Sequence, residues 1–85
     1  MKAIWQTIMH NGNQVRTVKM NGATWFVGED VANALGYANP REAVNKLVNR
    51  KDKKVAQVAI PVNGKFSIMT IINENGVEVL HRLKN

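Results

Sequence analysis

Apolar and polar residues alternate at every second position over two N-terminal segments, residues 3–9 and 14–19. This period of two is typical of a β-strand that buries one face. The pair Asn11-Gly12 separates the segments, and both residue types tolerate the positive φ that a type I′ hairpin turn requires. The pattern therefore predicts a β-hairpin, and the pair Asn21-Gly22 predicts a second turn into a strand over residues 24–27.

A third hairpin is predicted in the C-terminal half of the chain. Residues 54–62 and 65–72 are both rich in Val and Ile, and the pair Asn63-Gly64 separates them. Pro61 lies close to this turn, where the missing backbone N–H of proline disturbs the strand pairing least.

Between the hairpins the period of apolar residues changes from 2 to 3.6, which predicts two short helices. The first begins at residues 28–30, and Gly36 is a typical C-terminal stop. The second begins at Pro40, because proline is well tolerated at the first helical position. We expect Asp30 and Asn39 to cap these helices. The apolar face of the second helix consists of Ala43, Val44, Leu47 and Val48.

The last segment, residues 73–85, predicts an amphipathic helix that is capped by Asn73. Gly76 in its first turn costs about 1 kcal/mol relative to alanine. No repeat, low-complexity stretch or linker divides the chain. We therefore predict a single α+β domain over residues 1–85, with antiparallel hairpins and the element order β-β-β-α-α-β-β-α.

The composition is that of a small basic globular domain. The 85 residues include 12 Lys and Arg against 6 Asp and Glu, which gives a formal net charge of +6. The absence of cysteine excludes disulfides and thiolate chemistry. Neither a signal peptide nor an apolar run of membrane-spanning length is present, so we expect an intracellular protein that does not enter a membrane.

The side chains argue against an enzyme. Ser67 is the only serine, and no histidine lies near it in the sequence. His10 and His81 are isolated at opposite ends of the chain, without the spacing of metal ligands. Glu29 and Asp30 are neighbours at a helix start, where they point in different directions and stabilise the helix dipole. We therefore expect no catalysis, no metal ion and no cofactor.

Positive charge is concentrated in residues 41–54. This segment has six basic and two acidic residues, so it contributes +4 of the total charge of +6. A localised basic surface is typical of phosphate binding, although a solvated helix face with a Glu42–Lys46 pair would show the same pattern. The candidate phosphate contacts are Arg41, Lys46, Arg50, Lys51, Lys53 and Lys54.

The two predicted helices and their short connection also have the size of a helix-turn-helix. In that arrangement Asn45 and Asn49 would reach adenine edges in the major groove, and Arg41 would reach guanine. The same spacing fits any two packed helices, so the pattern leaves both interpretations open.

Residues 22–44 resemble the centre of the BRO N-terminal domain, which occurs in phage antirepressors and in baculovirus repeated proteins. Residues 71–76 are similar to the segment that begins the C-terminal helix in that family. The order of these motifs agrees along nearly the whole chain. The matching residues of the central motif are Trp25, Phe26, Val27, Asp30, Val31, Ala34, Leu35, Gly36, Tyr37, Asn39 and Pro40.

This resemblance implies a DNA-binding domain of low sequence specificity in a phage or prophage regulator that acts in the bacterial cytoplasm. Double-stranded DNA is then the expected partner. The alternative is a protein-interaction module that binds and inactivates a transcriptional repressor without appreciable DNA binding. The apolar motif residues are expected to be mainly core. An unpartnered apolar face formed by Val77, Leu80 and Leu83 would favour a homodimer.

Overall fold

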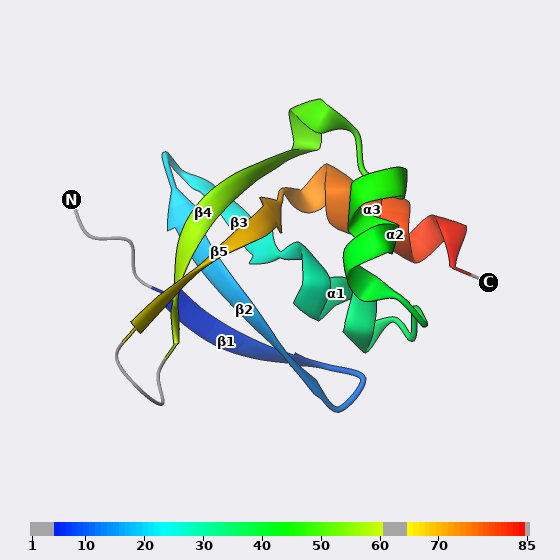
Figure 1. Ribbon diagram of the computed structural model, residues 1–85, viewed down its shortest axis with the longest axis horizontal. Coiled ribbons are helices and arrows are strands. Elements are labelled where there is room, and N and C mark those ends of the chain that lie inside the picture. The colour runs from blue at the N-terminus through cyan, green and yellow to red at the C-terminus, as the bar shows by residue number, and fades with distance from the viewer. Residues whose placement is uncertain (1–4, 61–64, 85) are drawn as a thin grey trace.

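The fold is an antiparallel five-stranded sheet with three α-helices, and the computed structural model describes residues 5–60 and 65–84 of it (Figure 1). The predicted α+β class and element order are confirmed, with one added turn of 3₁₀ helix. The strands are β1 (Trp5–His10), β2 (Asn13–Met20), β3 (Ala23–Val27), β4 (Lys53–Ile60) and β5 (Lys65–Ile72). The helices are α1 (Gly28–Ala34), α2 (Pro40–Leu47), the 3₁₀ turn η1 (Arg50–Asp52) and α3 (Glu74–Leu83).

The first two Asn-Gly turns are confirmed. Asn11 and Asn21 each have a φ of 51°, and the glycines that follow them have φ of 77° and 80°. Two consecutive positive φ angles define the type I′ turn, whose twist matches that of the strands it joins. The third pair, Asn63-Gly64, and Pro61 lie outside the described residues, but β4 and β5 pair as predicted from Lys53 opposite Ile72 onwards.

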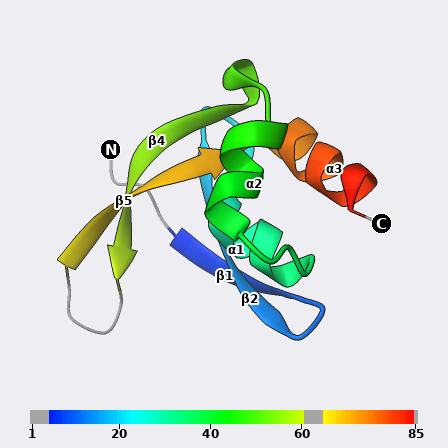
Figure 2. The same ribbon diagram turned by 45° about the vertical axis from the view of Figure 1, so that its right-hand side comes forward.

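All strands belong to one sheet, in the order β1-β2-β3-β5-β4. The N-terminal strands β1, β2 and β3 form a meander, and β4 and β5 form a ribbon. Two residue pairs join the two parts, Phe26 with Ile72 and Val27 with Ile71. Figure 2 shows the β4–β5 ribbon extending away from the helices beyond this junction.

The sheet has a hydrophobic core on each face. On one face the three helices pack against Val15 and Ile72 of the sheet, with Val31, Ala32, Val44 and Leu80 as buried helix residues. On the other face the sheet's own twist brings Val27, Val58 and Ile71 together with the half-buried rings of Trp5 and Trp25. Of the apolar motif residues, Val27, Val31 and Ala34 are buried, and the half-buried ones are Trp25, Phe26, Leu35 and Tyr37.

Two glycines allow the helices to lie close to Ile72. A Cβ on Gly28 would come within 3.0 Å of both methyl groups of Val44 and within 3.3 Å of Ile72. A Cβ on Gly76 would come within 2.9 Å of the Ile72 Cβ and 3.1 Å of Val48. The glycine that weakens α3 as an isolated helix is therefore needed for the helix to dock.

Asp30 does not cap α1, contrary to the prediction. Its carboxylate instead accepts three hydrogen bonds from Arg16 of β2, from the backbone N–H at 3.0 Å, from Nε at 2.8 Å and from Nη2 at 2.9 Å. This bidentate contact raises the pKa of the Arg16 guanidinium, and burial partly opposes the increase. Asn39 does occupy the N-cap position of α2, but its side chain makes no capping hydrogen bond.

Asn73 caps α3 as predicted, and its Oδ1 accepts a hydrogen bond of 2.9 Å from the backbone N–H of Gly76. The hydroxyl of Tyr37 donates a 2.7 Å hydrogen bond to the carbonyl of Leu80, and burial raises the pKa of this phenol. Leu80 is fully buried, whereas Leu83 is 52% exposed. The domain's own core therefore covers much of the apolar face on which the homodimer prediction depends.

We predict that Asp30→Ala lowers the free energy of unfolding by about 2–3 kcal/mol, because it leaves the partly buried guanidinium and N–H of Arg16 without their acceptor. Urea unfolding followed by tryptophan fluorescence measures the loss. Glu42→Ala is the control, since it removes an exposed ion pair worth about 0.5 kcal/mol or less. Equal losses in the two variants would contradict this role of Asp30.

Candidate nucleic-acid interface

The exposed face of α2 carries three of the predicted contact residues. Ala43 and Val44 turn inward to the core, which leaves Arg41, Asn45 and Lys46 exposed on the remaining face. The helix ends at Leu47, and the exposed Asn49 follows it before η1. The predicted amphipathic pattern of α2 is thus confirmed.

Two cations of α2 lie beside carboxylates. A nitrogen of Arg41 lies 3.7 Å from Glu29 of α1, and Nζ of Lys46 lies 3.1 Å from Glu42 one turn earlier. The side chain of Arg41 is 80% exposed, and the other three side chains of these pairs also reach solvent. Exposed pairs of this kind contribute about 0–1 kcal/mol, so breaking either pair costs the fold little.

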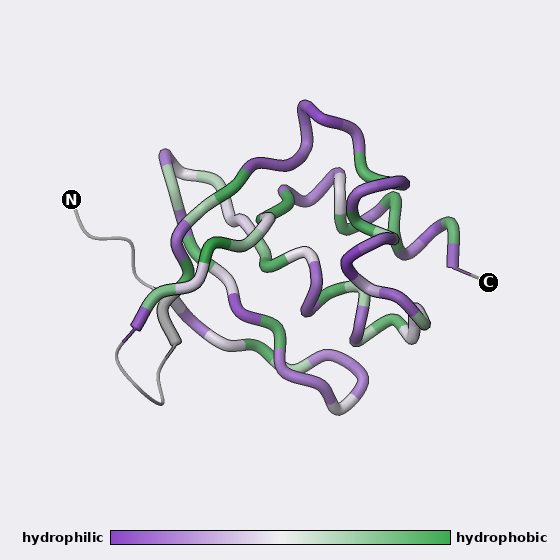
Figure 3. The backbone as a smooth tube through the Cα atoms, in the orientation of Figure 1, coloured by the Kyte–Doolittle hydropathy of each residue, from purple (hydrophilic) through white to green (hydrophobic). Residues whose placement is uncertain are grey.

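Arg50 and Lys51 lie on η1, which Figure 3 shows as part of a mostly hydrophilic stretch after α2. Both are exposed, and within the described residues neither side chain has a hydrogen bond or ion pair. The third residue of η1, Asp52, is buried and accepts a 3.1 Å hydrogen bond from Nδ2 of Asn73. This buried contact fixes η1 against α3 and leaves its two cations facing solvent.

The last two lysines of the basic segment, Lys53 and Lys54, are the first two residues of β4. Nζ of Lys53 donates to the carbonyl of Asn45 at 2.9 Å and to that of Val44 at 3.4 Å, where it stabilises the negative C-terminal end of α2. Successive residues of a strand point to opposite faces, and Nζ of Lys54 lies 4.3 Å from the ring centroid of Trp25 on the other face of the sheet.

The eight predicted residues therefore fall into two sets. The six residues that lie on α2, on η1 and between them are all exposed, and we call them the α2–η1 surface. It consists of Arg41, Asn45, Lys46, Asn49, Arg50 and Lys51. The remaining two, Lys53 and Lys54, hold parts of the domain together through α2 and Trp25.

The helix pair has features of a helix-turn-helix. α1 and α2 pack against each other through Gly28 and Val44, and residues 35–39 connect them. α2 has eight residues and is about 12 Å long, which is comparable to the width of the major groove of B-DNA. Its outer face is open over its whole length, as a recognition helix requires.

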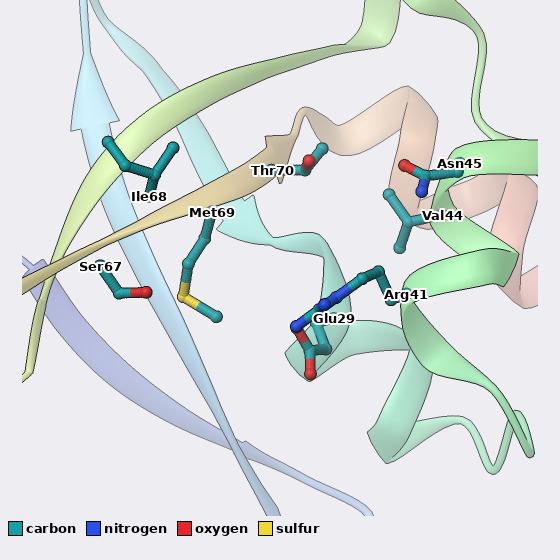
Figure 4. Close-up of a pocket in the computed structure, with 8 residues that line it drawn as sticks. All are labelled: Glu29, Arg41, Val44, Asn45, Ser67, Ile68, Met69 and Thr70. Atoms are coloured by element: carbon teal, nitrogen blue, oxygen red, sulfur yellow. The ribbon is translucent and has the colours of Figure 1, made fainter.

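A cleft of about 290 Å³ lies between α2 and β5 (Figure 4). Arg41 and Asn45 form its α2 side, and Ser67 and Thr70 belong to its β5 side. The cleft exists because β3 pairs with only the last two residues of β5, so none of the described strands pairs with this edge of the preceding residues. Sequence reasoning missed the β5 side, since no local pattern shows where a strand loses its neighbour.

A second groove, of about 420 Å³, lies between α3, α1 and the β1–β2 hairpin. His10 and His81 both border it, although they lie at opposite ends of the sequence. Its remaining lining is mainly apolar, with Glu74 and Glu78 as the acidic members. Among the described residues, no group of three or more His, Cys, Asp or Glu side chains is arranged to hold a metal ion.

The comparison with protein families gives one match. The family described as "BRO family, N-terminal domain" matches residues 14–80, which are 67 of the 85 residues. The match runs from β2 into α3 and includes the α2–η1 surface and the cleft beside it, whereas Ile8, His10 and His81 of the second groove lie outside it. No curated protein and no solved structure matches the chain. None of the helices in the described ranges has the length and apolar character needed to cross a membrane.

We predict that Lys53→Met destabilises the domain by about 1 kcal/mol, because the carbonyls at the end of α2 lose a cationic donor while the aliphatic stem is kept. Thermal unfolding followed by circular dichroism measures this effect. Lys51→Met is the matched control, and it should leave stability within about 0.5 kcal/mol. If the two variants unfold alike, Lys53 has no stabilising role of its own.

Proposed function

The chain belongs to the BRO family, and from this membership and the α2–η1 surface we propose that it binds double-stranded DNA with low sequence specificity. The family is one of phage and viral regulatory domains of DNA-binding type and not of enzymes. The observation that carries the proposal is the exposed pair Arg50 and Lys51, which have no partners among the described residues. These two cations are available to bind phosphates without breaking a contact of the fold.

Phosphate neutralisation supplies the affinity in this proposal. Each phosphate contact releases condensed counterions, so the affinity falls with rising salt concentration. Arg50 and Lys51 contact phosphates directly, whereas Arg41 and Lys46 exchange their exposed carboxylate partners for phosphates. Lys53 and Lys54 add to the local positive potential while they keep their contacts within the domain.

Base contacts come from α2 in the same proposal. Asn45 and Asn49 present amide groups that pair with adenine edges, and Arg41 presents the donor fork that pairs with guanine. Because α2 has only two turns, few base pairs lie within its reach, which accords with low specificity. The domain would then act as the DNA-binding part of an antirepressor-type phage or prophage regulator of transcription in a bacterial cytoplasm.

We predict that Arg50→Ala with Lys51→Ala weakens the binding of a fluorescently labelled random duplex, because two phosphate contacts are lost. The slope of log K against log salt concentration should become shallower by about two units. Fluorescence anisotropy over a salt series from below to near physiological concentration measures both quantities. Lys19→Ala is the control, since this exposed lysine lies on β2, outside the α2–η1 surface. An unchanged slope in the double variant would remove η1 from the interface.

The mainly apolar groove between α3 and the β1–β2 hairpin supports a second candidate function, the binding of a transcriptional repressor. Its floor includes Phe26, Val31 and Val77, and a groove of this size and lining is typical of sites that take a partner's apolar side chains. Glu74 and Glu78 beside it repel phosphates and favour a partner segment that carries Lys or Arg. This candidate uses a different surface from the DNA proposal.

We predict that expression of the chain in a lysogenic bacterium raises the phage titre if it inactivates a repressor, and that Ile8→Lys abolishes this effect by placing a charge in the groove. Ile8 lines the groove and is 46% exposed. Met9→Lys is the matched control, because the next residue of a strand points to the other face. Full induction by the Ile8 variant would exclude the groove from repressor binding.

A further inference from the structure

We propose that the β4–β5 ribbon is a second DNA-contacting element, whose exposed apolar side chains lie against the sugars and base edges of the duplex beside α2. This inference rests on the proposed function and extends it to a surface with a different kind of contact. The side chains are Val55 of β4 and Phe66 and Ile68 of β5.

The three side chains form one continuous patch. Val55 is 66% exposed, Phe66 65% and Ile68 66%, so three of the six large hydrophobic side chains that are exposed in the described part of the chain lie here. Val55 pairs with Thr70 and therefore lies diagonally next to Ile68, and Phe66 follows two residues from Ile68 on the same face. We call this the ribbon patch.

The opposite face of the ribbon is already used by the fold. Val58 and Ile71 are fully buried there against the half-buried rings of Trp5 and Trp25. One face therefore holds the ribbon in place while the other presents large apolar groups to water. A patch of this kind on a small domain is typical of an interaction surface.

The ribbon patch is continuous with the α2–η1 surface. Ile68 lines the cleft that Arg41 and Asn45 line from α2, and Figure 4 shows these two side chains on the side of the helix that faces β5. A ligand that lies along the exposed face of α2 and follows it across the cleft therefore reaches the ribbon patch. A single partner can therefore contact α2 and the β4–β5 ribbon together.

The charges of the ribbon favour DNA as this partner. Neither β4 nor β5 contains Asp or Glu, and Lys53 lies on the same face as the ribbon patch, whereas Lys54 and Lys65 lie on the other face. Glu29 is the one carboxylate among the residues that line the cleft, and Arg41 lies beside it. A two-stranded ribbon fits a DNA groove, and Phe and Ile side chains are among those that contact or unstack bases.

The apolar contacts of the ribbon patch can be distinguished from phosphate contacts by how the affinity depends on salt. Burial of Phe66 and Ile68 against bases and sugars adds affinity without releasing counterions, because neither side chain is charged. Loss of the ribbon patch therefore lowers affinity equally at every salt concentration. Loss of cations from η1 instead changes the salt slope.

We predict that Phe66→Ala with Ile68→Ala weakens duplex binding about tenfold at each salt concentration, with the slope unchanged. Fluorescence anisotropy with the same labelled duplex measures this, and circular dichroism checks that the fold is intact. Met9→Ala is the matched control, because Met9 is 63% exposed on β1 and lies outside both surfaces. Wild-type affinity in the double variant would overturn the proposal.

Three further outcomes are informative. If the unmodified chain binds no duplex even at low salt, the proposed function fails and this inference fails with it. If the unmodified chain sediments as a dimer and the double variant as a monomer with full DNA affinity, the ribbon patch is an interface between copies and the inference alone is overturned. Enhanced fluorescence of 2-aminopurine in the bound duplex, lost on Phe66→Ala, would support base unstacking by the ribbon.

Discussion

The structure depends on two adjacent residues, Ile71 and Ile72, at the end of β5. Their pairs with Val27 and Phe26 are the only pairs that join the ribbon to the meander in the described sheet. Because successive strand residues point to opposite faces, Ile72 enters the core under the helices and Ile71 enters the core on the other face, and both are fully buried. The junction therefore fixes strand order, helix docking and the position of the ribbon together.

The candidate DNA interface follows from how short this junction is. β3 ends after two pairs because the chain turns into α1 at Gly28, and this glycine lets Val44 of α2 approach Ile72 closely. In the described sheet the rest of β5 then pairs with β4 alone, and the cleft lies between its other edge and α2. If β3 paired along all of β5, a strand would occupy this space, and the ribbon patch and the α2–η1 surface would be separated.

Much of the fold is predictable from local patterns, because Asn-Gly turns and the change of period from 2 to 3.6 are local properties of the chain. The role of Asp30 was not predictable in this way. At a helix start its charge favours a cap, and only the tertiary fold brings Arg16 within reach. The candidate site is also predictable only in part. The amphipathic pattern places Asn45 on the exposed face of α2, whereas the cleft depends on where β3 ends. That the predicted residues of α2 and η1 bind DNA stays a prediction.

The number of basic residues in a segment does not give the number of phosphates that the segment can contact. Lys53 donates to the end of α2 and Lys54 lies over Trp25, so these charges already stabilise the domain. Arg50 and Lys51 make no such contacts with the described residues, because the buried Asp52 holds η1 and leaves their side chains in solvent. Counterion release on binding depends on cations that move into contact with phosphates, and not on the net charge of the segment. In the proposed interface, the contacts of Asp52, Lys53 and Lys54 within the fold therefore determine which cations remain for phosphates.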